Sequence, residues 1–225
     1  MAEISVSAFA ADFFHMERDL EVARENGADS IHVDVMDGHF VPLFGFSQPW
    51  IRQMLTWDAR CGDVHLMAGL EEGIPEDFLK LPLQRLTIHI EAAAPERLKA
   101  YLGQIREAGM EAGLAAAPWT KPEELEPFFP YADEILLMSC SPGTEGAAFR
   151  EDIYGRIRCV RALLEKEKRS CRIAVDGGLS EERALACIGC GAGRVIIGRA
   201  FFTSADKKGM AARVREASFM EEKGV

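Results

Sequence analysis

Short apolar segments alternate with longer amphipathic segments along almost the whole chain, and this alternation restricts the fold more than any other feature. The apolar segments have the length of buried strands, and eight are candidates: Ile4–Phe9, Ser30–Val35, Asp63–Met67, Arg85–Ile90, Glu111–Ala117, Glu134–Ser139, Arg172–Asp176 and Arg194–Gly198. The amphipathic segments have the length of helices, and examples are Asp12–Asn26, Pro95–Ala108, Glu151–Lys168 and Glu181–Cys190.

Repetition of strand and helix at this spacing requires parallel strands joined by right-handed crossovers. Eight such units close a (β/α)8 barrel. A chain of 225 residues fits one such barrel, and no linker or low-complexity tract interrupts it. We therefore predict the α/β class, with a (β/α)8 TIM barrel in a single domain that covers residues 1–225.

The charge and hydropathy of the chain exclude several classes of partner. A net charge of −10 disfavours nucleic acid and anionic membranes, since both require clustered Lys and Arg. No apolar run approaches the ~20 residues that span a bilayer. No signal peptide is visible either, so a cytoplasmic location is the expectation. Six cysteines do not form a disulfide framework in a chain of this length, and we expect Cys187 and Cys190 to be reduced thiols.

The segment Ile31–Phe40 (IHVDVMDGHF) carries the strongest chemical signal. Side chains alternate between the two faces of a strand, so His32, Asp34 and Met36 share one face, while the apolar residues between them can pack under helices. A buried imidazole and carboxylate are costly unless they hold a metal, a partner or a substrate.

Further polar residues fall at the carboxyl ends of other predicted strands, where catalytic groups of such barrels lie. They are Ser7, His65, His89 and Asp176, and the apolar Met138 occupies the same position on its strand. Two histidines and two carboxylates (His32, Asp34, His65 and Asp176) suit one divalent ion, Zn, Fe(II), Mn or Co, and do not choose among them. With a Lewis acid between them, the two aspartates can remove a proton beside a carbonyl on one face and return it on the other. The quartet therefore favours an epimerase, and a satisfied buried polar network is the alternative.

The sequence resembles the ribulose-phosphate 3-epimerase family. The resemblance lies in Ile31 to Pro42 (IHVDVMDGHFVP), DVHLM at 63–67, LMS at 137–139, SPG at 141–143 and VDGG at 175–178. It implies a metal-dependent barrel that interconverts D-ribulose 5-phosphate and D-xylulose 5-phosphate, an isomerase of the pentose phosphate pathway.

Transferred to this chain, the resemblance implies that His32, Asp34, His65 and Asp176 bind the metal, and that Asp34 and Asp176 are the acid/base pair. It also implies substrate contact by Ser7 and an apolar lining formed by Met36, Met67 and Met138, although methionines at strand ends also serve as core filler. His89 is either a partner of the site or a structural group. A homo-oligomer is expected, with Phe201 and Phe202 as exposed interface candidates.

The expected phosphate site departs from the family pattern. Backbone N–H groups in the loops after strands six to eight commonly bind phosphate in such barrels; the candidates are Gly143, Gly146, Gly177, Gly178, Gly198 and Arg199. Thr144-Glu145 replaces a Phe-Gly pair, and Arg199 replaces a serine. Arg199 can grip the phosphate, or it can pair with Glu145 and reshape the anion pocket.

These departures leave the substrate open between ribulose 5-phosphate and a hexulose 6-phosphate such as allulose 6-phosphate, with an unphosphorylated ketose as a weaker option. A catalytically silent sugar-phosphate sensor is a further alternative, but no ligand or acid/base residue is lost. A metal-free decarboxylase of the orotidine-monophosphate type is disfavoured, because Met36 stands where that chemistry requires a lysine.

Overall fold

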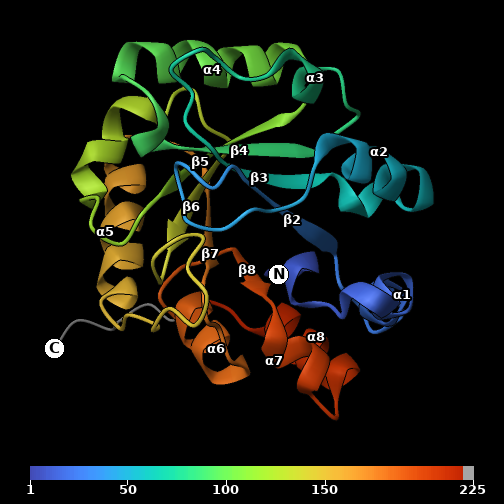
Figure 1. Cartoon of the computed structure of the whole chain (residues 1–225). Helices are drawn as coiled ribbons and strands as arrows, with labels where there is room; N and C mark the ends of the chain where they lie inside the picture. The colour runs from blue at the N-terminus through green and yellow to red at the C-terminus, as the bar shows by residue number, and fades with distance from the viewer. Residues whose placement is uncertain (220–225) are drawn as a thin grey trace, which may run out of the picture.

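Eight parallel strands close into a barrel in sequence order in the computed structural model, which describes residues 1–219 (Figure 1). The strands are β1 Glu3–Ser7, β2 Ser30–Met36, β3 Asp63–Met67, β4 Arg85–His89, β5 Glu111–Ala116, β6 Glu134–Met138, β7 Arg172–Asp176 and β8 Arg194–Ile197. Strand β8 pairs with β1, which closes the sheet. The predicted (β/α)8 barrel is confirmed, while residues 220–225 of the predicted domain lie outside the described residues.

The α-helices surround the barrel (Figure 1). They are α1 Met16–Glu25, α2 Gln48–Trp57, α3 Glu76–Leu79, α4 Pro95–Glu107, α5 Ile153–Lys166, α6 Glu181–Gly189, α7 Arg199–Thr203 and α8 Lys207–Glu216. The 3-10 helices are η1 Ala8–Ala10, η2 Phe13–His15, η3 Ala59–Gly62, η4 Ile90–Ala92 and η5 Pro122–Phe128. The helix η5 stands between β5 and β6, where the alternating pattern would place an α-helix.

Two predicted boundaries near the N-terminus are wrong. The first strand ends at Ser7 rather than Phe9, because the chain turns into η1 there. The first helix begins at Met16 rather than Asp12, because the Asp12 side chain accepts a hydrogen bond from the Phe14 N–H and caps η2 instead. The other strands differ from the prediction by at most one residue at their carboxyl ends.

The strands are buried on both faces, as parallel strands covered by helices must be. Outward-facing residues such as Val33 and Leu86 belong to the main core shared with the helices. A smaller apolar cluster joins Leu136, Met138 and Ala174 to residues of β5 and β8. Because these side chains alternate with the outward set, they fill the interior of the barrel.

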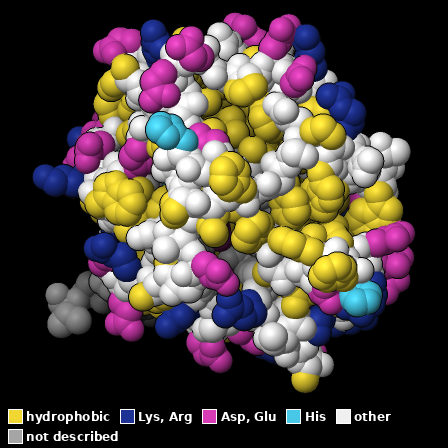
Figure 2. Space-filling model, viewed as in Figure 1, with side chains coloured by type: hydrophobic (Ala, Val, Ile, Leu, Met, Phe, Trp, Pro, Cys, Tyr) yellow, Lys and Arg dark blue, Asp and Glu magenta, His cyan; other side chains and the backbone are white. Residues whose placement is uncertain are grey.

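The face seen in Figure 2 carries groups of hydrophobic side chains across its middle and right. The most exposed large ones of the described residues include Phe14 and Phe44. Phe201 is fully buried, so the prediction that it is an exposed interface residue is wrong; Phe202 is half-buried. The oligomeric state stays a prediction. Over residues 1–219, no helix is long and apolar enough to cross a membrane.

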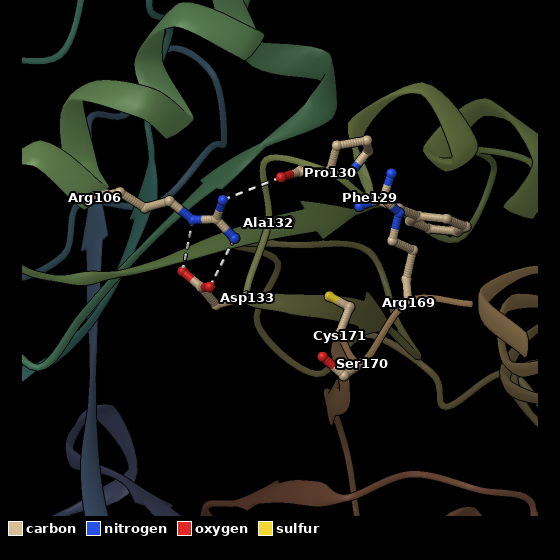
Figure 3. A pocket seen from close by; sticks show the side chains of 8 residues that line it. All are labelled: Arg106, Phe129, Pro130, Ala132, Asp133, Arg169, Ser170 and Cys171. Atoms are coloured by element: carbon tan, nitrogen blue, oxygen red, sulfur yellow. Dashed lines mark hydrogen bonds and ion pairs between the residues drawn. The ribbon is translucent and has the colours of Figure 1, made fainter. Parts of the chain in front are cut away.

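A shallow pocket of about 170 Å³ opens beside Asp133 and Cys171, which directly precede β6 and β7 (Figure 3). It therefore lies at the amino-terminal end of the barrel, opposite the end where catalytic residues of such barrels lie. The Arg106 guanidinium in its wall is already paired with the Asp133 carboxylate at 2.7 Å. The pocket is thus separate from the candidate site.

Candidate active site and metal centre

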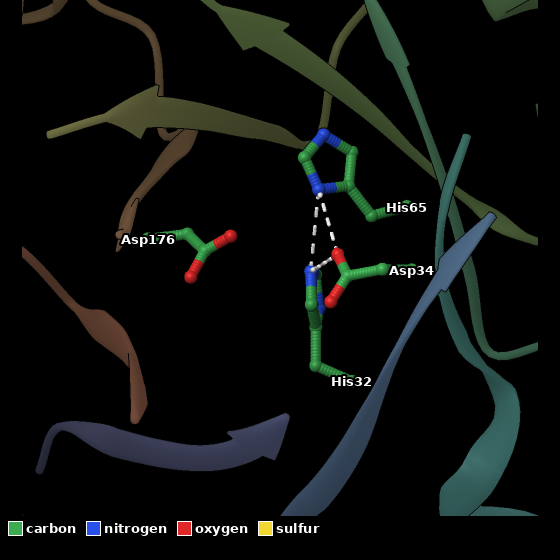
Figure 4. Close-up of side chains that lie close together, drawn as sticks. All are labelled: His32, Asp34, His65 and Asp176. Carbon is green, nitrogen blue, oxygen red and sulfur yellow. Dashed lines mark hydrogen bonds and ion pairs between the residues drawn. The ribbon is translucent and has the colours of Figure 1, made fainter. Parts of the chain in front are cut away.

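Four side chains predicted to act together converge at the carboxyl-terminal end of the barrel (Figure 4). His32 and Asp34 come from β2, His65 from β3 and Asp176 from the end of β7. Parallel pairing sets Asp34 directly opposite His65, and one ligand atom from each of the four lies within 4.8 Å of the others. Asp176 faces this group from the opposite side of the mouth.

The donor atoms fit a small divalent cation. His32 Nε2, His65 Nδ1 and Asp34 Oδ1 lie 3.4 Å from one another. Ligands about 2.1 Å from a tetrahedral ion are themselves about 3.4 Å apart, so the spacing matches such an ion. Asp34 Oδ1 is buried without a hydrogen-bond partner, which is costly for an ionised oxygen unless a cation faces it. The site can therefore hold a metal, although metal binding itself stays a prediction.

The surroundings shift the pKa values of the site in opposite directions. Burial disfavours the charged form of His32, but the carboxylates of Asp63 and Asp34 outweigh it and raise its pKa to about 10. Burial likewise opposes ionisation of Asp34, yet His32 and His65 hold its pKa below the ordinary value. For Asp176 burial prevails, and its pKa is raised. Asp176 therefore keeps a proton more readily than Asp34, which favours its charged form.

Each histidine of the quartet has a partner behind it. His32 Nδ1 lies 2.9 Å from an oxygen of Asp63, whereas His65 Nε2 lies 2.9 Å from His89 Nε2. His89 Nδ1 in turn lies 3.0 Å from Glu91 Oε2. Asp63 and Glu91 are not among the predicted site residues. The available signal for Asp63 was its position two residues before His65, on the same strand face.

The predicted substrate-contacting residues surround the quartet, and their roles stay predictions. The Ser7 hydroxyl donates a hydrogen bond to Asp34 Oδ2 at 3.1 Å. Met36 and Met67 lie side by side on paired strands and form a buried cluster with Val41. Met138, on β6, lies opposite Asp176 of β7 and belongs to the cluster inside the barrel. The three methionines are thus placed around the mouth in two separate groups.

The predicted phosphate-binding glycines lie in the loops after β6, β7 and β8. Gly177 has a φ of +114°, and a Cβ there would meet Cys140 Sγ at 2.6 Å, so only glycine fits this close approach. Gly143, Gly146 and Gly178 also have positive φ values. Arg199, the first residue of α7, and Glu145 are both exposed. Among residues 1–219 no ion pair joins them, so the structure does not support the pairing alternative.

Comparisons with known proteins agree with this geometry. The model of the "Ribulose-phosphate 3 epimerase family" matches residues 3–202. The chain is 37% identical over 213 residues to a ribulose-phosphate 3-epimerase of Chlamydia muridarum, covering 94% of this chain and 92% of the relative. It is 32% identical over 216 residues to the Bacillus subtilis enzyme of the same name, covering 96% and 99%.

Solved structures share the fold at lower identity. KGPDC from Streptococcus mutans has a TM-score of 0.68 at 14% identity, covering 96% of this chain and 97% of that one. A 3-hexulose-6-phosphate synthase from Salmonella typhimurium has a TM-score of 0.66 at 17% identity, with 96% and 97% covered. These two likenesses concern the barrel alone. The family match and the two close relatives show more: the chain belongs to the ribulose-phosphate 3-epimerase family and is an isomerase.

Proposed function

We propose that the chain is a metal-dependent epimerase that inverts C3 of D-ribulose 5-phosphate to form D-xylulose 5-phosphate. The observation that carries the proposal is the position of Asp34 and Asp176 on opposite sides of a site formed with two histidines. Two carboxyl groups so placed can reach the two faces of one carbon. The named relatives support the sugar.

The proposed reaction consists of two proton transfers. One aspartate removes the C3 proton from one face of the ketose phosphate, which leaves a planar enediolate, and the other aspartate delivers a proton to the opposite face. A divalent ion held by His32, Asp34, His65 and Asp176 would supply Lewis-acid stabilisation of the negative charge on the substrate oxygens. The opposite pKa shifts of Asp34 and Asp176 suit a pair in which one carboxyl group starts ionised and the other protonated.

The apolar residues at the mouth have a role in this proposal. The cluster of Met36, Met67 and Val41 is buried beside Asp34. A surface of this kind excludes water, which strengthens electrostatic interactions and slows loss of the abstracted proton to solvent. We propose that these side chains and Met138 enclose the reacting carbons, and that Ser7 holds both Asp34 and a substrate oxygen.

A hexulose 6-phosphate such as allulose 6-phosphate is the second candidate substrate. The observation that favours it is the altered phosphate loop, where exposed Glu145 brings negative charge near the glycines expected to bind phosphate. A longer sugar would place its phosphate at a different position relative to Glu145. Arg199 would supply the compensating positive charge for either substrate.

Proton exchange at C3 in D2O, followed by NMR, tests the function and chooses the sugar. Protein loaded with zinc would be incubated separately with ribulose 5-phosphate and allulose 6-phosphate. We expect deuterium at C3 and appearance of the epimer with ribulose 5-phosphate. Exchange with allulose 6-phosphate alone would select the second substrate. Absence of exchange with both sugars, in protein shown to hold zinc, would contradict the epimerase and favour a silent sensor.

Replacement of Arg199 with serine is expected to raise the KM for ribulose 5-phosphate by about tenfold with little change in kcat, because a charge-assisted hydrogen bond to phosphate stabilises bound substrate and transition state alike. Steady-state kinetics of the two proteins would measure this effect. Lys208→Ser removes an exposed positive charge from α8 and is the matched control. An unchanged KM in the Arg199 variant would show that Arg199 does not contact the phosphate.

Zinc binding is expected to tighten by about tenfold for each unit of pH increase near neutrality. The pKa of His32 is about 10 in the metal-free protein, so below that pH the ring carries a second proton, which must leave before Nε2 can bind a cation. Raising the pH removes this competition. Competition titrations with a chelator at several pH values would give the slope, and a zinc affinity independent of pH would show that no ligand loses a proton on binding, against the raised pKa of His32.

A further inference from the structure

We propose that Glu91 and His89 fix the tautomer of His65, so that His65 presents an unprotonated Nδ1 to the metal site. This inference rests on the proposed metal site and assigns two positioning residues to it. The three groups form a continuous chain of hydrogen bonds: Glu91 Oε2 lies 3.0 Å from His89 Nδ1, and His89 Nε2 lies 2.9 Å from His65 Nε2. Both imidazoles are fully buried.

The direction of this chain is set at Glu91. An ionised carboxylate can only accept hydrogen bonds, so His89 must donate through Nδ1–H. A neutral imidazole with a proton on Nδ1 has a lone pair on Nε2. His65 must therefore donate its own Nε2–H to His89, which leaves His65 Nδ1 without a proton. That nitrogen is the one that faces Asp34 and His32.

The geometry of the rings supports a hydrogen bond between them. The planes of His65 and His89 differ by 14°, and their centroids are 4.9 Å apart while the two Nε2 atoms are 2.9 Å apart. The rings thus meet edge to edge in nearly one plane, where imidazole N–H bonds and lone pairs point. His32 has no such relay, since its Nδ1 faces the Asp63 carboxylate directly at 2.9 Å.

Glu91 is itself held in one orientation. Its other oxygen, Oε1, accepts hydrogen bonds from the Ala117 N–H at 2.8 Å and from the Thr120 hydroxyl. A glutamine at this position would keep its amide oxygen toward these donors and turn its NH2 group toward His89. His89 would then accept through Nδ1 and donate through Nε2, which would reverse the chain and place a proton on His65 Nδ1. Glu91→Gln therefore nearly preserves the shape of the side chain but reverses the direction of donation along the chain of hydrogen bonds.

Nitrogen NMR of the histidine rings in the metal-free protein, at about pH 8, tests the assignment directly. We expect wild-type His65 to carry its proton on Nε2 and the Glu91→Gln variant to carry it on Nδ1. The zinc dissociation constant of that variant should rise by about 10- to 100-fold, the usual range for residues that orient a ligand. Glu123→Gln, an exposed change whose side chain contacts Cys159 rather than a histidine, should alter neither quantity.

Glu91→Asp separates orientation from packing, because it shortens the side chain but keeps an acceptor-only carboxylate. We expect it to retain the wild-type tautomer and to bind zinc more tightly than Glu91→Gln. A wild-type His65 with its proton on Nδ1 would overturn the proposal, even if Glu91→Gln failed to fold. Weaker zinc binding in Glu91→Gln without a change of tautomer would also overturn it, since loss of charge alone would then explain the effect. None of these measurements uses a sugar, so absence of C3 exchange in protein with normal tautomers and zinc binding would contradict the proposed function alone.

Discussion

Replacement of Asp176 with asparagine is expected to lower the turnover of ribulose 5-phosphate by about 10³-fold or more, within the range found when a positioned acid or base is removed. An amide preserves the shape of the side chain but cannot carry a proton to or from carbon. The fold should remain, because Asp176 lies partly exposed at the mouth and its backbone oxygen, which accepts from the Ser139 N–H at 2.7 Å, is unchanged.

The same variant makes a sharper prediction in D2O. With Asp34 intact, one epimer should still exchange its C3 proton without inversion, while the other epimer should not; Asp34→Asn should show the opposite preference. Zinc content must be measured in both variants, because both aspartates are proposed ligands. Asp77→Asn is the control, since Asp77 is an exposed carboxylate on α3. Turnover by Asp176→Asn within a few fold of wild type would contradict the two-aspartate mechanism.

The barrel could be predicted from the sequence because parallel strands are buried on both faces and therefore appear as short continuous apolar runs between amphipathic helices. The errors occurred where short-range hydrogen bonds compete with this pattern. Asp12 caps a 3-10 helix inside a segment with helical periodicity, and Ala8–Ala10 turns although its composition suits a strand. Phe201 was placed on the surface because no periodicity marks the buried side of a five-residue helix.

The site was predictable to the extent that strand alternation determines which side chains share a face. His32 and Asp34 follow from that alternation, and His65 follows from the pairing of neighbouring strands. The partners behind His65 do not follow from it. Glu91 lies beyond the end of β4, and its orientation depends on Ala117 and Thr120, which are distant in sequence. Asp63 follows from the same pairing, since it lies directly opposite His32 on β3, but its contact with Arg194 of β8 arises only when the barrel closes.

The charged residues beneath the site support the second large prediction, which concerns stability. Arg194 is fully buried and donates to Glu134 at 3.0 and 2.6 Å and also to Asp63. Arg85 contacts Asp63 at 3.2 Å from the other side. The free-energy cost of removing these charges from water is offset only while every charge keeps its partners.

Arg194→Leu is therefore expected to lower the free energy of unfolding by about 3–5 kcal/mol, because it leaves Glu134 buried with a lost partner. Urea denaturation of the zinc-free protein would measure the change without a contribution from bound metal. Arg213→Leu is the matched control, because Arg213 also contacts two carboxylates, Glu181 and Asp206, but does so in solvent; its unfolding midpoint should hardly move.

Adding Glu134→Met to Arg194→Leu should recover part of the loss, since removing both members of a buried ion pair is less costly than removing one, which leaves Glu134 with only the longer contacts to Arg85 and Arg172. If Arg194→Leu proved no more destabilising than Arg213→Leu, the remaining arginines would have to balance both carboxylates: Arg85 lies 3.5 Å from Glu134 and 3.2 Å from Asp63, and Arg172 lies 3.6 Å from Glu134. Arg194 would then not be needed to hold Asp63 as the partner of His32 at the base of the metal site.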